Sequence, residues 1–248
     1  MPEHVDHFPS THATWIDAQL TIAERSRAAG DAAGEVSAIG SLRQHLMERY
    51  HAALRAYVLG GSLRKLGEAD ELVGGFFADR ACGPAFLAQW RASGLPLRRW
   101  MMTGINLYGK SIIRDRTRDR EHPGGDIDPG SLVDDSTAER AFERAWALSV
   151  LNAALERVHA ELADQGRIDD YEIFRRRVIA GEPYAQVAAD EGRTEQQCAG
   201  ATRLVTERLR TALRDVLRDE GVTEPEVSTA ISEVYDAFGI ARRMGGGT

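Results

Sequence analysis

The chain has 248 residues, of which 43% are apolar and 28% charged, and its formal net charge is −7. These values are typical of a globular protein with one or two domains, and the acidic balance excludes a general nucleic-acid coat protein, so any DNA-binding surface must be local. No stretch holds the roughly 20 successive apolar residues of a membrane span, and the charged first ten residues are unlike a secretory signal. The only cysteines, Cys82 and Cys198, are too few for a disulfide framework or a four-ligand zinc site. We therefore expect a cytoplasmic protein that binds no membrane, metal or cofactor.

Helical spacing dominates the first half of the chain, whereas strand patterns are scarce. One apolar stripe repeats every four residues, as in a helix buried on one side: Leu42, Leu46, Tyr50, Leu54 and Val58. A short helix is predicted over 70–79, and a third helix begins at Leu97 and runs into a set of arginines. These patterns predict a helical domain over 41–121, preceded by an N-terminal extension over 1–40.

The composition changes abruptly over 122–136, which holds two prolines, three glycines and four aspartates. Such a segment is typical of a flexible, acidic linker. Beyond it, the capping boxes Ser136-x-x-Glu139 and Thr194-x-x-Gln197 predict two long helices, which place a second helical domain over 137–220. A further box, Thr223-x-x-Glu226, predicts an amphipathic C-terminal helix within a tail over 221–248. The fold class that follows is all-α, with two helical domains, a linker and a C-terminal helix.

The sequence does not support catalysis. The histidines are scattered, no nucleophile is framed by a neighbouring base, and no glycine-rich phosphate loop follows a strand. Cys198 occupies an apolar helix position, where a buried thiol is the ordinary outcome. We therefore expect a protein that is not an enzyme.

A helix-turn-helix is predicted over 184–210, where a short helix ends at Gly192 and a capped helix follows. Glutamine reads adenine in the major groove, and a helix N-terminus attracts phosphate. From 203 to 218 there are five arginines against two acidic residues. The alternative is a helical hairpin with a solvated charged face. The residues expected at the DNA are Thr194, Glu195, Gln196, Gln197 and Arg203.

A second basic strip covers 97–121, with seven basic residues against three acidic ones. Trp90, Trp100 and Tyr108 lie among or beside these charges. Arginine with aromatic side chains is a combination that binds single-stranded nucleic acid, because phosphates are neutralised while bases stack. The alternative is that the aromatic side chains belong to the core.

Three segments, in this order, resemble those of bacterial RNA polymerase sigma factors of the extracytoplasmic-function (ECF) group, most closely its planctomycete-like subfamily. Glu68–Phe77 (EADELVGGFF) is similar to the family's "AEDLxQxxF" helix, which docks on the clamp coiled coil of the polymerase β′ subunit. Leu97–Arg118 is similar to "FRxWLxxIAxNxxxDxxR", which melts and reads the −10 promoter element. Phe174–Arg210 is similar to the second sigma domain, whose helix-turn-helix reads the −35 element and rests on the β flap.

The resemblance implies a sigma region 2 helical bundle and a sigma region 4 helix-turn-helix, with core RNA polymerase and promoter DNA as partners and an anti-sigma factor as a further one. The −35 reader would be the predicted helix-turn-helix. In the docking helix the two acids would face the clamp, while the apolar side chains pack mostly within their own domain. The polymerase-binding residues would be Asp70, Glu71, Leu72, Phe76 and Phe77. The −10 residues would be Arg98, Arg99, Trp100, Asn106, Lys110, Arg114, Arg116 and Arg118.

The chain departs from the family pattern at two places. Gly74 stands where the docking helix usually has glutamine, and Ala199, Gly200 and Leu204 stand where relatives often have basic or bulky residues. Two alternatives to a sigma factor therefore stay open. One is a sigma-like module that binds polymerase or another protein without ordinary promoter recognition, and the other is a stand-alone helix-turn-helix regulator.

Overall fold

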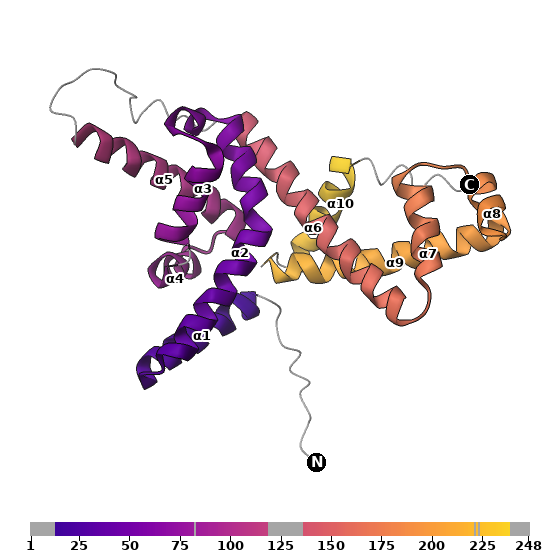
Figure 1. Ribbon diagram of the computed structural model, residues 1–248, viewed down its shortest axis with the longest axis horizontal. Helices are drawn as coiled ribbons and strands as arrows, with labels where there is room; N and C mark the ends of the chain where they lie inside the picture. The colour runs from indigo at the N-terminus through magenta and orange to yellow at the C-terminus, as the bar shows by residue number, and fades with distance from the viewer. Residues whose placement is uncertain (1–12, 82, 119–135, 221, 223, 239–248) are drawn as a thin grey trace, which may run out of the picture. The chain divides into compact units, whose positions relative to one another are not determined.

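The computed structural model describes residues 13–81, 83–118, 136–220, 222 and 224–238 (Figure 1). Every regular element within these ranges is helical, which confirms the all-α class. Contacts divide the chain into two compact units. Unit 1 comprises Met1–Trp146 with Asp219–Gly221, and unit 2 comprises Ala147–Arg218 with Val222–Thr248.

The division between the units falls inside a helix, α6 (Ser136–Asp164), after Trp146, whereas the sequence analysis begins the second domain at residue 137. The physical reason is an apolar stripe at the start of α6. Ala138, Phe142 and Trp146 are all at most 3% exposed and pack within unit 1. The expected linker lies outside the described residues, except for Ser136, which begins α6.

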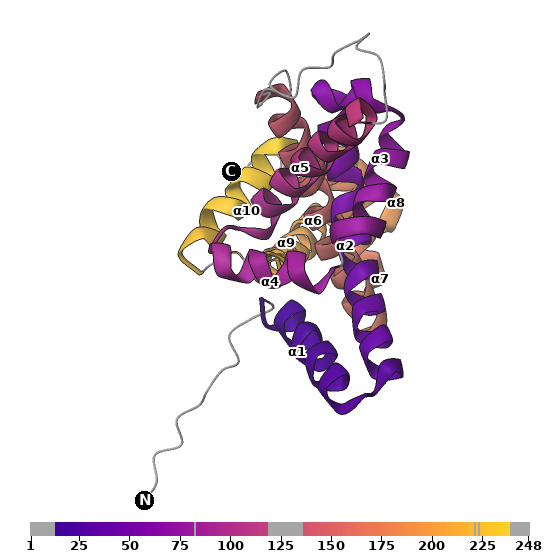
Figure 2. The same cartoon turned by 90° about the vertical axis from the view of Figure 1, so that its left-hand side faces the viewer.

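Unit 1 begins with a hairpin of two helices, α1 (Ala13–Ala29) and α2 (Ala32–Gly60), which lie side by side (Figure 2). Gly30, with a φ of 72°, turns the chain between them, and the carboxylate of Asp31 caps α2 by accepting a hydrogen bond from the Gly34 N–H. Part of the expected N-terminal extension is therefore continuous with the helix that carries the Leu42–Val58 stripe.

The rest of unit 1 surrounds an aromatic core. A 3₁₀ turn, η1 (Ser62–Leu66), leads to α3 (Ala69–Phe76), a π-helical turn η2 (Phe77–Ala81), α4 (Pro84–Ser93) and α5 (Leu97–Arg118). Phe76 lies within 6.0 Å, between ring centroids, of Phe77, Phe86 and Tyr108. α5 passes close to this cluster because Gly104 has no side chain: a Cβ there would lie 2.7 Å from Phe86 and 2.9 Å from Phe76.

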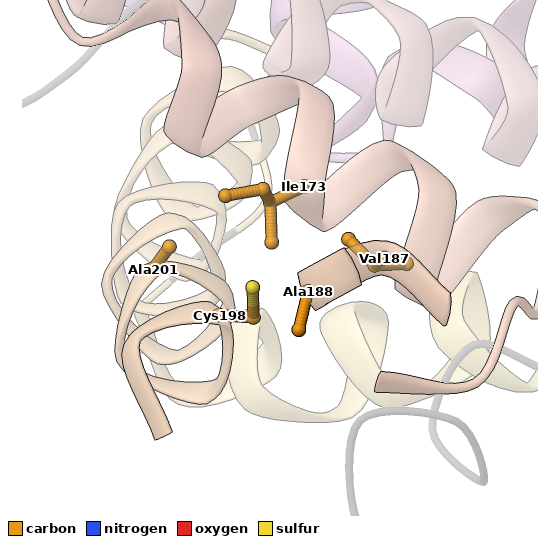
Figure 3. Packing of buried hydrophobic residues seen from close by; sticks show 5 residues of the cluster. All are labelled: Ile173, Val187, Ala188, Cys198 and Ala201. Atoms are coloured by element: carbon orange, nitrogen blue, oxygen red, sulfur yellow. The ribbon is translucent and has the colours of Figure 1, made fainter. Parts of the chain in front are cut away.

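Unit 2 continues α6 and adds α7 (Ile168–Phe174), the π-helical turn η4 (Arg175–Ile179), α8 (Tyr184–Glu191), α9 (Glu195–Asp219) and α10 (Glu224–Phe238). Gly192, with a φ of 62°, ends α8 as predicted. A small core brings α7, α8 and α9 together (Figure 3) and consists of Ile173, Val187, Ala188, Cys198 and Ala201. The apolar positions of α10 are buried as the stripe predicts at Val227 and Val234, while the side chain of Phe238 lies outside the described set.

Candidate nucleic-acid interface

The basic strip belongs to α5, one face of which is buried. Leu97, Met101 and Ile105 are at most 1% exposed and hold the helix in the core of unit 1. In the described part of the chain, four basic side chains of α5 have no acidic partner, and all are exposed except Lys110, which is half-buried. We call this group the open basic end of α5: Lys110, Arg114, Arg116 and Arg118.

The first two arginines of the strip are, by contrast, paired with acidic residues of α6. Nη1 of Arg99 lies 3.2 Å from Oε2 of Glu139, and Nε of Arg98 lies 3.7 Å from Oε2 of Glu143. The guanidinium carbon of Arg98 also lies 4.7 Å from the centroid of the Trp146 ring, a distance at which a cation is attracted to the ring face. The side chains of both arginines are therefore engaged within unit 1.

Trp100 and Asn106 face the interior more than the sequence analysis expected of residues that contact DNA. Trp100 is half-buried and lies 5.4 Å from Phe86 between ring centroids, which fits the alternative that the aromatic side chains are core. The side-chain amide of Asn106 donates a hydrogen bond of 2.7 Å to the hydroxyl oxygen of Tyr57. Of the eight residues expected at the −10 element, four therefore have contacts within unit 1 and four form the open basic end of α5.

The acidic face of α3 has the predicted division between inside and outside. Asp70 and Glu71 are exposed, while Leu72, Phe76 and Phe77 are buried in unit 1. Asp70 already has basic neighbours from α2: its carboxylate lies 3.1 Å from Nε of Arg55 and 3.8 Å from Nε2 of His51. Glu71 has no such neighbour among the described residues, so it is the freer of the two acids.

The predicted helix-turn-helix corresponds to α8 and α9 of unit 2, and the predicted capping box begins α9. The Thr194 N–H donates to the side-chain oxygen of Gln197 at 2.8 Å, and the Gln197 N–H donates to the Thr194 hydroxyl at 3.2 Å. Thr194 and Gln197, two of the five residues expected at the −35 element, therefore cap the N-terminus of α9. The other three, Glu195, Gln196 and Arg203, are exposed, and a Cβ at the nearby Gly200 would meet nothing within 4 Å.

Arginines also hold the helix-turn-helix together, a role that the sequence analysis missed. Arg176 in η4 contacts Glu182, Asp190 and Glu191 within 3.1 Å, and these hydrogen bonds raise its pKa. Arg193 donates to Asp170 at 2.8 Å. Burial acts to raise the pKa of Asp170, but hydrogen bonds from Arg193 and Arg167 outweigh it, so this pKa lies below its ordinary value. The available signal was three successive arginines at 175–177, followed about four helical turns later by the acidic pair at 190–191.

A buried charged cluster in unit 1 was not predicted either. Glu220 is 4% exposed, and its carboxylate accepts a hydrogen bond of 2.5 Å from the Tyr50 hydroxyl and lies 2.7 Å from Nε of Arg49. Burial raises the pKa of Glu220, while Arg49, Tyr50 and Trp146 favour its charged form. Burial also raises the pKa of Tyr50, which the neighbouring Glu220 raises further. No local pattern connects residues 170 positions apart, so this cluster could not be predicted from the sequence.

Chemically, the open basic end of α5 suits a polyanion, whereas the exposed acids of α3 suit a basic partner. Within the described ranges, no group of histidine, cysteine and acidic side chains has the arrangement of a metal site, and no helix has the length and apolar character to cross a membrane. Comparison of the chain with protein-family models, curated proteins and solved structures found no match.

Proposed function

We propose that this protein is a sigma-type specificity subunit, which binds core RNA polymerase in the bacterial cytoplasm and directs it to promoter DNA. The observation that carries the proposal is the open basic end of α5. Although the net charge is −7, four cationic side chains without acidic partners in the described part of the chain gather at one end of this helix. They are suited to follow the phosphates of a DNA strand.

Two further features support this function. Unit 2 carries a helix-turn-helix whose second helix begins with an intact capping box and exposes Gln196 and Arg203. Unit 1 exposes Asp70 and Glu71 on a short helix whose apolar side is fully used in the core. A stand-alone regulator needs the first feature alone, whereas a polymerase subunit needs both.

A second candidate function is a polymerase-binding module without ordinary promoter recognition. The start of α9 favours this candidate. The side chains of Thr194 and Gln197 are used for capping, and Gly200 has no side chain that could contact DNA. This candidate is also favoured by the pairing of Arg98 and Arg99 within unit 1. The two candidates share the docking surface and differ in promoter opening.

The test combines polymerase binding with transcription. The purified chain is mixed with bacterial core RNA polymerase and analysed by gel filtration, then used in transcription on a promoter library with core polymerase alone as the control. A sigma factor gives a complex and specific transcripts. A complex without transcripts indicates the second candidate, and DNA binding without a complex indicates a stand-alone regulator.

A matched charge reversal tests the docking surface. Replacing Glu71 by Arg should weaken the complex because it reverses a charge that has no basic neighbour in the described part of unit 1. Replacing Glu156, an exposed residue of α6, by Arg makes the same change of net charge and should leave the complex intact. Equal binding by both variants and the unmodified chain would rule out this face of α3. Because exposed charges contribute little to stability, both variants should fold.

A further inference from the structure

The first three turns of α6 carry two glutamates that occupy the start of the basic strip on α5. Glu139 pairs with Arg99 at 3.2 Å, and Glu143 lies 3.7 Å from Arg98. A carboxylate presents to a guanidinium the same charge and the same kind of acceptor oxygens as a phosphate. The two glutamates therefore stand where a nucleic-acid backbone would have to bind these arginines.

Apolar packing holds this part of α6 in place. Phe142 is fully buried, with its ring centroid 6.5 Å from that of Tyr50 and 6.3 Å from that of Tyr57. At Ala138, α6 approaches α2 so closely that a Cβ on Gly60 would lie 3.1 Å from the Ala138 Cα. The glutamates are thus carried by a segment with its own attachment to unit 1, and the ion pairs are not the main source of that attachment.

Arg98 is restrained from a second side. Its guanidinium lies over the ring of Trp146, which is 3% exposed and helps to stabilise the charge of the buried Glu220. The side chain of Arg98 is 24% exposed, compared with 48% for that of Arg99. Both arginines are covered by acidic side chains, whereas the open basic end of α5 has no acidic cover within the described residues.

We propose that 136–146 is a built-in competitor that keeps Arg98 and Arg99 from binding nucleic acid until the start of α6 is displaced. Among the described basic residues of α5, the open basic end is the part available for phosphates in the free chain. Displacement of the segment adds two cationic contacts next to Trp100. The nucleic-acid part of this inference rests on the proposed function, whereas the masking of the two arginines does not.

The first experiment measures masking without any nucleic acid. The full chain is treated with phenylglyoxal, which modifies accessible guanidinium groups, and the rate at each arginine is followed by mass spectrometry. In the variant Glu139→Gln/Glu143→Gln, which keeps the shape of both side chains, Arg98 and Arg99 should react about two- to fivefold faster, as expected for the loss of an exposed ion pair. Arg114, Arg116 and Arg118 serve as internal references and should react at unchanged rates.

A matched control removes the same two charges from the same helix. The variant Glu156→Gln/Asp164→Asn changes exposed acids of α6 that belong to unit 2. It should leave the rates at Arg98 and Arg99 unchanged. Equal acceleration by both variants, or none by Glu139→Gln/Glu143→Gln, would overturn the proposal.

The second experiment adds single-stranded oligo-dT and measures affinity against salt concentration. Each arginine released to a phosphate should steepen the slope of log K against log salt by about 0.7. The Glu139→Gln/Glu143→Gln variant should therefore bind more tightly and with a steeper slope than both the unmodified chain and the control. Unchanged binding in a chain that does bind oligo-dT would overturn the competitor role. If no variant binds DNA or polymerase while the phenylglyoxal rates change as expected, the proposed function fails and the masking of the arginines stands.

Discussion

Glycine has opposite consequences at two positions of unit 1. Gly74 lies in the middle of α3, where a Cβ would meet nothing within 4 Å. Its missing side chain therefore weakens the helix without serving the packing around it. Gly104 in α5 is buried, and a Cβ there would lie less than 3.0 Å from both Phe86 and Phe76. Sequence alone showed two helical glycines and did not distinguish their roles.

These environments predict opposite effects of the same substitution. Gly74→Ala should raise the free energy of unfolding by up to about 1 kcal/mol, because alanine favours the helix. Gly104→Ala should lower it, because overpacking a core costs about 1–3 kcal/mol and exceeds the same gain in helix propensity. Urea unfolding followed by circular dichroism measures both. A stabilised Gly104→Ala variant would show that the aromatic core yields more readily than its contacts indicate.

At the scale of elements, local patterns were sufficient where both partners of an interaction lie within one turn. The Thr194–Gln197 box and the left-handed Gly192 were both expected from their spacing, and both are present. The start of α6 shows why the same reasoning failed elsewhere. The stripe of Ala138, Phe142 and Trp146 predicts a buried helix face, but it does not tell which part of the chain buries it.

The exposed face of α9 offers a test of the proposed DNA binding. Gln196, Gly200 and Arg203 are exposed and spaced to lie on one side of the helix, and Gly200 has free space around it. Gly200→Arg should therefore increase affinity for duplex DNA and steepen the slope of log K against log salt by about 0.9. Gly200→Ala is the control, because it gives the same kind of gain in helix propensity without a charge. Equal DNA affinity of the two variants would mean that this face of α9 does not lie against DNA.

At the scale of the whole molecule, the class and the order of the helices could be predicted, whereas the boundary of the units could not. The all-α class follows from apolar stripes that each lie within one helix. One part of this boundary is the assignment of Glu220 to unit 1 together with Arg49 and Tyr50, although 170 positions separate it from Tyr50. Apolar periodicity relates residues within one helix, so it cannot indicate that Glu220 is buried against residues so far away in the sequence. The pairing of Arg98 and Arg99 with α6 was missed for the same reason.

Glu220 predicts a specific dependence of stability on pH. Burial raises its pKa, so the folded protein holds this proton more tightly than the unfolded chain does. Its contribution is therefore fully present below the ordinary carboxyl pKa of about 4.3 and is lost as pH rises through the raised value. The glutamine in Glu220→Gln cannot ionise, so this variant does not lose stability in this way as pH rises. Its free energy of unfolding, relative to that of the unmodified chain, should increase across this window and then level off.

Asp170 provides a control, because its contribution to the free energy of unfolding should change with pH in the opposite direction. Arg193 and Arg167 overcome the effect of burial and lower its pKa, so its contribution is present above the ordinary value and is lost as pH falls through the lowered one. Relative to the unmodified chain, Asp170→Asn should therefore lose stability as pH rises through the acid range, where Glu220→Gln does not. Urea unfolding at a series of pH values, from about 3 to 8 around the ordinary carboxyl range, measures both variants. Parallel curves for Glu220→Gln and the unmodified chain would mean that Arg49 and Tyr50 fully compensate the buried charge. In that case the ionised carboxylate of Glu220, directly after α9, would be buried in unit 1 without lowering the free energy of unfolding.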